Sequence, residues 1–127
     1  MRIALDTNRY TDFVRNDFAV VKILSYASKV FIPFAVLAEL RAAFAGGSRS
    51  QANEAILTKI LASPRVEVLY PDQETTHHYA AIYQQLRRQG TPIPSNDIWI
   101  SALVVQYGLV LYARDHHFDH LPQIPRI

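Results

Sequence analysis

The stretch SNDIWISALVVQYGLVLYARD, residues 95–115, decides the fold class. Residues 98–105 are apolar almost all round at helical spacing, and a helix of that kind is normally buried. Ser95 or Asn96 suits the cap of this helix, and Gly108 suits its end. Residues 109–113 then predict a buried strand, and Asp115 follows it. A buried helix that leads into a buried strand is typical of α/β proteins.

The same alternation continues through the rest of the chain. The spacing of apolar residues predicts strands over 2–5, 30–34, 66–70 and 109–113, and the last residues, 117–127, could add a short edge strand. Helices are predicted over 7–14, 17–28, 35–47, 49–62, 72–90 and 95–107. Parallel strands need crossover connections, which helices usually supply. We therefore expect an α/β fold, a three-layer α/β/α sandwich around a mainly parallel sheet of four to five strands.

Composition limits the class of protein further. The chain has 127 residues, of which 50% are hydrophobic, so we expect one domain over residues 1–127. It contains no cysteine, which excludes disulfides, thiolate nucleophiles and cysteine-based zinc sites. The longest uncharged run, 98–113, is too short for a membrane span, and we expect a cytoplasmic protein that does not contact membranes. The net charge of +2 permits nucleic-acid binding without requiring it.

Four acidic residues stand at informative positions. Asp6 follows the first predicted strand and Asp115 follows the fourth, and in parallel sheets ligands bind beyond the carboxyl ends of the strands. Asp97 lies at the start of the apolar helix, and Glu39 lies on the flank of the apolar stripe of its own helix. Each has a plainer explanation: helix capping for Asp6 and Asp97, and a boundary glutamate, paired with an arginine, for Glu39.

Taken together, these acids indicate a metal site. Carboxylates that converge without compensating cations repel one another, and a divalent cation removes that cost. Magnesium or manganese suits oxygen ligands, and such a site makes phosphate-ester hydrolysis accessible. The sequence has neither a cysteine nor a serine within a G-x-S-x-G elbow to support a nucleophilic alternative.

Three stretches carry a family resemblance: ALDTNRYTDFV (4–14), FIPFAVLAELRAAF (31–44) and PIPSNDIWISALVVQYGLVLYARDHHFDHLP (92–122). Together they resemble the PIN-domain ribonucleases, specifically the VapC-type toxins of bacterial toxin–antitoxin systems. The resemblance implies an endoribonuclease that depends on Mg2+ or Mn2+, with an acidic centre of Asp6, Glu39, Asp97 and Asp115 and with Asn8 in a supporting position. It also implies a homodimer and inhibition by a VapB-type antitoxin, which a groove with Tyr10, Phe13 and Phe18 could accept.

Two residues depart from the family pattern. Ala113 stands where many relatives carry a threonine or serine, so a hydroxyl group near Asp115 is missing. Arg9 stands where relatives often carry an apolar residue. Neither departure removes one of the four acids.

Substrate contacts are predicted less directly. Arg87, Arg88, Arg114 and His116 are candidates for contact with RNA phosphates or bases. For Arg87 and Arg88 the alternative is a favourable interaction with the end of their own helix. Tyr79, Tyr83, Trp99 and Phe118 are expected to be core residues rather than base-stacking surfaces.

Three other interpretations remain open from the sequence. The run DHHFDH, 115–120, could hold a metal through His116 and His120 if it were helical. A signalling receiver domain shares the alternating pattern but needs a lysine late in the chain, and the last lysine is Lys59. A non-catalytic PIN-fold module that binds RNA or protein would show no carboxylate-dependent metal site.

Overall fold

A four-stranded parallel sheet in the order β3-β2-β1-β4 forms the centre of the fold, as expected from the sequence. The structure, a computed structural model, describes residues 1–127. The elements, in chain order, are β1 (Arg2–Leu5), α1 (Thr7–Val14), α2 (Phe18–Ser25), β2 (Lys29–Pro33), α3 (Phe34–Gly46), α4 (Ser50–Leu61), β3 (Val66–Leu69), α5 (Gln73–Gln89), α6 (Ser95–Tyr107), β4 (Val110–Tyr112) and the 3-10 helix η1 (His116–His120).

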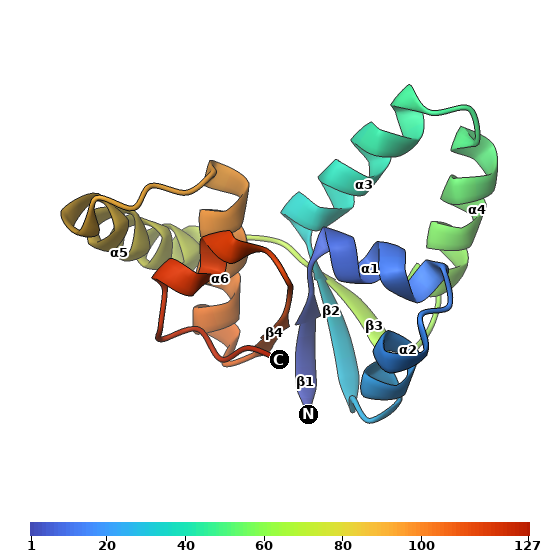
Figure 1. Cartoon of the computed structure of the whole chain (residues 1–127), viewed down its shortest axis with the longest axis horizontal. Helices are drawn as coiled ribbons and strands as arrows, with labels where there is room; N and C mark the ends of the chain where they lie inside the picture. The colour runs from blue at the N-terminus through green and yellow to red at the C-terminus, as the bar shows by residue number, and fades with distance from the viewer.

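The topology explains the three layers. The chain moves from β1 through β2 to β3 in one direction across the sheet and then returns past β1 to β4. Right-handed crossovers therefore place α1 to α4 on one face and the α5–α6 pair on the other. Figure 1 shows the two groups on either side of the strands, with α5 and α6 packed together. All four strands point the same way, so their carboxyl ends share one edge.

The apolar helix α6 is buried, as its sequence predicts. It begins at Ser95 directly after Pro94, and no side chain caps it, so the prediction that Ser95 or Asn96 caps it is wrong. The physical reason is that both side chains have other partners: Ser95 lies 3.1 Å from the Tyr79 hydroxyl, and Asn96 donates to Glu39. Gly108 ends the helix at φ 62°, a left-handed conformation that suits glycine.

The other main difference from the sequence-based prediction is at the C-terminus. Only an isolated bridge joins Arg126 to Leu111 of β4, so the residues after η1 add no fifth strand. Arg126 nevertheless fastens this segment, because its guanidinium donates to the backbone oxygens of Ala113 and Asp115. No helix is both long enough and apolar enough to span a membrane.

The four aromatic residues predicted to lie in the core differ in how deeply they are buried. Phe118 is fully buried, as expected. Tyr83 is exposed, with 43% of its surface accessible, and Tyr79 and Trp99 are only half-buried. The prediction that these three are core residues is wrong for Tyr83, whereas Tyr79 packs against the hydrophobic core and Trp99 packs against Phe34 of α3.

Candidate active site

Asp6 lies at the carboxyl end of β1, at the start of α1. Its carboxylate makes no capping hydrogen bond to the helix, so capping does not explain it. The residue is only 5% exposed, which is unusual for an aspartate. Its backbone N–H donates to Tyr112 O of β4, which ties Asp6 to the strand that precedes Asp115.

Glu39 reaches the same edge from α3 and is half-buried. Its two carboxylate oxygens accept hydrogen bonds from Thr7 Oγ1 (2.9 Å to Oε2) and from Asn96 Nδ2 (3.2 Å to Oε1). One donor follows Asp6 in the chain and the other precedes Asp97. Glu39 therefore bridges the first turns of α1 and α6, and the alternative of an arginine-paired boundary glutamate is wrong.

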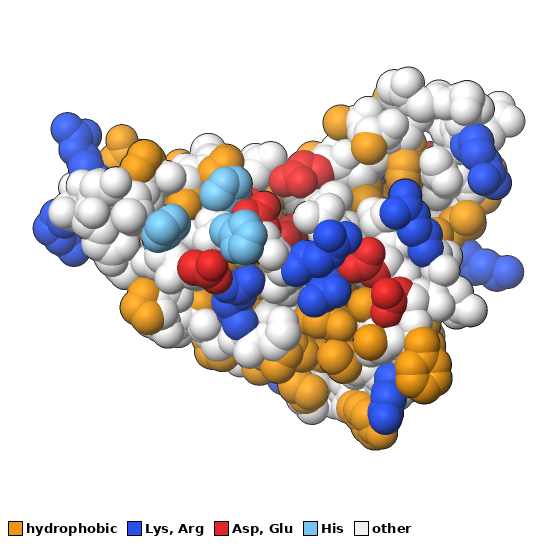
Figure 2. Space-filling model, in the orientation of Figure 1, with side chains coloured by type: hydrophobic (Ala, Val, Ile, Leu, Met, Phe, Trp, Pro, Cys, Tyr) orange, Lys and Arg blue, Asp and Glu red, His pale blue; other side chains and the backbone are white.

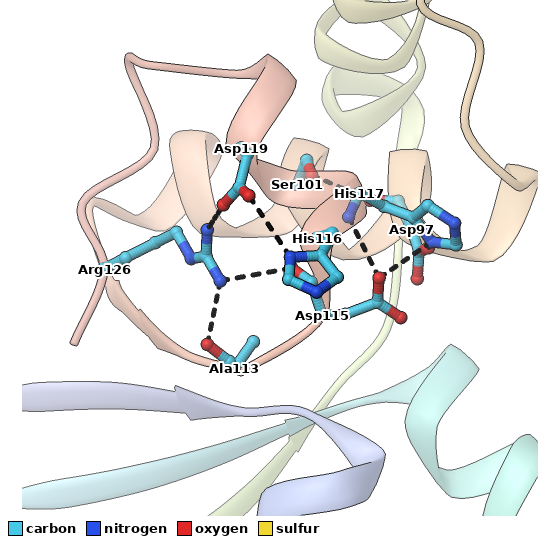
Figure 3. A network of polar contacts seen from close by, with 8 residues as sticks. All are labelled: Asp97, Ser101, Ala113, Asp115, His116, His117, Asp119 and Arg126. Carbon is cyan, nitrogen blue, oxygen red and sulfur yellow. Dashed lines mark hydrogen bonds and ion pairs between the residues drawn. The ribbon is translucent and has the colours of Figure 1, made fainter.

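Asp97 and Asp115 meet at His117 (Figure 3). His117 Nδ1 lies 2.7 Å from Asp97 Oδ2 and 3.1 Å from Asp115 Oδ1. Asp115 also caps η1 by accepting a bond from the His117 backbone N–H. Asp97, only 8% exposed, lies in the first turn of α6 and caps no helix. Its contacts are directed toward Asp115 and His117.

The electrostatics show that the four carboxylates act on one another. Burial, with a smaller contribution from the charges of Asp97, Glu39 and Asp115, raises the pKa of Asp6 to about 6, although the neighbouring Thr7 backbone N–H opposes the change. Burial also raises the pKa of Asp97, and Asp115 and Glu39 add to this, whereas the hydrogen bond from His117 lowers it. No lysine or arginine forms an ion pair with any of the four. The site thus concentrates negative charge without a lysine or arginine partner.

The ligand chemistry suits a divalent cation. One ligand atom each from Asp97, Asp115 and His117 lies within 4.8 Å of the others. Asp6 and Glu39 do not belong to that group, although the charges of Asp97, Glu39 and Asp115 all act on Asp6. The alternative pair of His116 and His120 is not brought together, because η1 is a 3-10 helix with about three residues per turn. His116 is almost fully exposed and pairs with Asp119 at 3.5 Å.

Figure 2 shows acidic side chains and histidines gathered on one area of the surface, with basic side chains beside them. Arg114 donates to Asp12 through two hydrogen bonds of 3.0 and 3.2 Å, and Arg9 also donates to Asp12. Asn8 is exposed and makes no hydrogen bond to the four acids. Arg87 and Arg88 are exposed at the end of α5 and contact none of the four.

Three residues that organise this site were not predicted to do so: the sequence placed His117 only beside the alternative pair of His116 and His120, and it did not single out Thr7 or Arg126. His117 joins Asp97 to Asp115, Thr7 orients Glu39, and Arg126 holds the backbone on either side of Arg114. The two histidines that directly follow Asp115 in the sequence were a signal that could have pointed to His117. Ala113 is buried with its carbonyl bound by Arg126, so this loop is held through its backbone.

A family model described as the PIN domain matches residues 3–124. The chain belongs to the PIN domain family. Among curated proteins, this PIN domain is 30% identical over 103 residues to Ribonuclease VapC1 of Haemophilus influenzae strain R2866, a match that covers 81% of the chain and 67% of the relative. It is 27% identical over 88 residues to Ribonuclease VapC4 of Mycobacterium tuberculosis, covering 69% and 68%.

Solved structures show the same fold. The PIN domain aligns with a TM-score of 0.90 and 21% identity to a chain of VapBC2 from Rickettsia felis bound to a promoter DNA fragment, covering 100% of this chain and 98% of the other. VapBC-1 from Haemophilus influenzae aligns with a TM-score of 0.87 and 23% identity, covering 100% of this chain and 97% of the other. VapC20 of Mycobacterium tuberculosis is described as a toxin that cleaves the sarcin–ricin loop. It aligns with a TM-score of 0.72 and 18% identity, covering 94% of this chain and 95% of the other.

Proposed function

We propose that this PIN domain is an endoribonuclease that hydrolyses RNA phosphodiester bonds with Mg2+ or Mn2+, and that it is the toxin of a toxin–antitoxin pair. The observation that carries the proposal is the meeting of Asp6, Glu39, Asp97 and Asp115 at one sheet edge without a lysine or arginine partner. The names of the relatives, Ribonuclease VapC1 and VapC4, support the reaction.

The donor set fits a hard divalent cation. Carboxylate oxygens are the ligands that magnesium and manganese prefer, and the raised pKa of Asp6 shows that its charge costs free energy that a bound cation would recover. Asp6, Asp97 and Asp115 would hold the ion, with Glu39 beside them. When bound, such an ion lowers the pKa of water and neutralises charge on a phosphate.

The chain's own residues fix the geometry of the acids. His117 holds Asp97 and Asp115 through one ring nitrogen, while Thr7 and Asn96 hold the two oxygens of Glu39. Groups that orient ligands in this way reduce the reorganisation that binding requires. The acids come from β1, α3, α6 and the segment after β4, so folding assembles the site before substrate arrives.

An apolar groove supports the proposed antitoxin. A cavity of about 280 Å³ opens between α1, α2 and the strands, and nine of its twelve lining residues are hydrophobic. Tyr10 and Phe13 line it as the sequence suggested, whereas Phe18 does not line it and is 81% exposed nearby on α2. We propose that a segment of a VapB-type antitoxin docks here. Failure of the chain to co-purify with a small protein from its own operon would count against this.

The homodimer and the cytoplasmic location implied by the family resemblance remain predictions. Light scattering on the purified chain measures its mass in solution and tests the first. Fractionation of the native cell tests the second.

The reaction is tested by incubating labelled total RNA with the purified, antitoxin-free chain in magnesium, manganese or EDTA. The test variant is Asp97→Asn, which keeps the shape of the side chain and removes its charge. The matched control is Glu67→Gln, which changes an exposed acid on β3 that pairs with Lys29. We expect discrete cuts with metal from the wild type and the control, none in EDTA, and cleavage lower by about a hundredfold or more with Asp97→Asn.

Two results would contradict the proposal. Cleavage that continues in EDTA would exclude the metal requirement. A folded wild type that binds no divalent cation and cuts no RNA would favour the non-catalytic module that binds RNA or protein through the same fold.

A further inference from the structure

We propose that His117 is itself a ligand of the divalent cation at Asp97 and Asp115, and that its ring nitrogen makes the site select Mn2+ over Mg2+. This inference rests on the proposed function, which assigns the cation to carboxylates, and it names the residue that decides which cation binds. His117 then has two roles, because it holds the two acids in the metal-free protein and binds the ion together with them.

The ring nitrogen of His117 lies where a third ligand belongs. Nδ1 is 2.7 Å from Asp97 Oδ2 and 3.1 Å from Asp115 Oδ1 (Figure 3). Two ligands at right angles around an octahedral ion, each about 2.1 Å from it, lie about 3 Å apart. The nitrogen therefore already has the separation from each oxygen that neighbouring ligands of one small cation have.

Hydrogen bonding alone does not satisfy this arrangement. Nδ1 carries either one hydrogen or one lone pair, so it can make one full hydrogen bond but not one to each carboxylate. Neither carboxylate has a lysine or arginine partner. A divalent cation binds all three atoms at once. Its charge is balanced by the two carboxylates, and an uncharged imidazole adds no repulsion among the ligands.

The backbone fixes the ring in this position before a cation arrives. Asp115 caps η1 by accepting a bond of 2.9 Å from the His117 backbone N–H, so His117 is tied to one of the two acids at its main chain as well. The next residue, Phe118, is fully buried and anchors η1 in the core. A side chain that is already held in place loses little conformational freedom when it binds an ion.

A nitrogen ligand distinguishes manganese from magnesium. Imidazole is a ligand of transition-metal ions, whereas magnesium prefers carboxylates, water and phosphate oxygens. The other histidines of η1 supply no such ligand. His116 is directed toward Asp119 at 3.5 Å, and the side chain of His120 is exposed and pairs with no acid. Selection of Mn2+ therefore depends on His117 alone.

Pulsed electron paramagnetic resonance of Mn2+ bound to the full, RNA-free chain tests the ligand directly, because a bound nitrogen couples to the electron spin of the ion. We expect nitrogen coupling in the wild type and its loss in His117→Asn, which keeps a donor near the position of Nδ1 but has no imidazole nitrogen. His120→Asn, the same change at an exposed histidine of η1, should keep the coupling. The wild-type spectrum decides the question even if a variant fails to fold.

Competition between Mn2+ and Mg2+ for the metal-free chain measures the selectivity. Loss of an outer partner of a metal site already costs about 10- to 100-fold in affinity, so loss of a ligand should lower the ratio of Mn2+ to Mg2+ affinity by about tenfold or more in His117→Asn. His120→Asn should keep the wild-type ratio. An unchanged ratio in His117→Asn would overturn the inference, because a residue that only positions the acids affects both cations alike.

The outcomes separate this inference from the proposed function. Bound Mn2+ without nitrogen coupling overturns the inference even if the chain cuts RNA with either metal, and the nuclease proposal then stands. Coupling that is lost in His120→Asn rather than in His117→Asn also overturns it. Coupling that depends on His117 in a chain that cuts no RNA supports the inference and refutes the nuclease.

Discussion

Replacing Asp6 by asparagine should stabilise the metal-free protein at neutral pH. Asp6 is buried among three other acids, so its ionised form is disfavoured in the folded state. Asparagine has nearly the same shape and carries no charge, so it removes this cost without opening a cavity. The same substitution should abolish RNA cleavage, since it removes a proposed ligand.

The expected gain in the free energy of unfolding for Asp6→Asn follows from the pKa of Asp6. It rises from 3.8 to about 6, and at about 1.36 kcal/mol per unit this corresponds to about 3 kcal/mol. Below pH 3.8 both states are protonated and Asp6 costs nothing. Between 3.8 and about 6 the unfolded chain ionises while the folded protein keeps the proton, so the free energy of unfolding falls as pH rises. Above pH 6 or so the full cost remains.

Urea unfolding in EDTA, at about pH 7.5 and about pH 4, measures this difference. We expect Asp6→Asn to exceed the wild type by up to about 3 kcal/mol at the higher pH, roughly 10 °C in Tm, and to match it at the lower. Glu67→Gln, an exposed control, should show no such gain. Saturating Mg2+ should reduce the gain, because it binds and stabilises only the wild type. An Asp6→Asn protein that is less stable at both pH values would refute the electrostatic reasoning.

Three further substitutions test the site and the fold. Asp97→Asn should lower metal-dependent cleavage by about a hundredfold or more while the protein still folds, whereas an unfolded variant would make the residue structural. Thr7→Val removes the donor to Glu39 in a nearly isosteric way, and steady-state kinetics should show a loss on the order of tenfold; unchanged kcat/KM would exclude its orienting role. Gly90→Ala places a side chain at φ 69° and should cost about 1 kcal/mol in urea unfolding, while Gly46→Ala, inside α3, should cost nothing; equal effects would contradict this.

The sheet and its order of elements could be predicted because the relevant signals are local. Apolar runs predicted all four strands. Because the strands are parallel, their carboxyl ends lie together, and Asp6 follows the end of β1 while Asp115 follows the end of β4. The acids on helices were harder. Glu39 and Asp97 could be singled out as unusual, but only the fold shows that Asn96, the residue before Asp97, donates to Glu39.

What the sequence could not predict depends on contacts between distant residues. His117 contacts Asp97 only because η1 folds back onto the start of α6, and a 3-10 turn gives no strong periodic signal. Helical spacing alone cannot distinguish a core face from an exposed one, which is why the accessible surface of Tyr83 was unexpected. The prediction that Ser95 or Asn96 caps α6 was wrong because both side chains bind residues of other helices, Tyr79 of α5 and Glu39 of α3.

The most direct measurement is an anomalous difference map from a crystal of this chain grown with Mn2+. We expect a peak among the carboxylates of Asp6, Asp97 and Asp115, absent in crystals of Asp97→Asn. A peak at His116 and His120, away from those acids, would contradict the metal centre proposed here. So would a map without a peak from a protein that cuts RNA in the same solution.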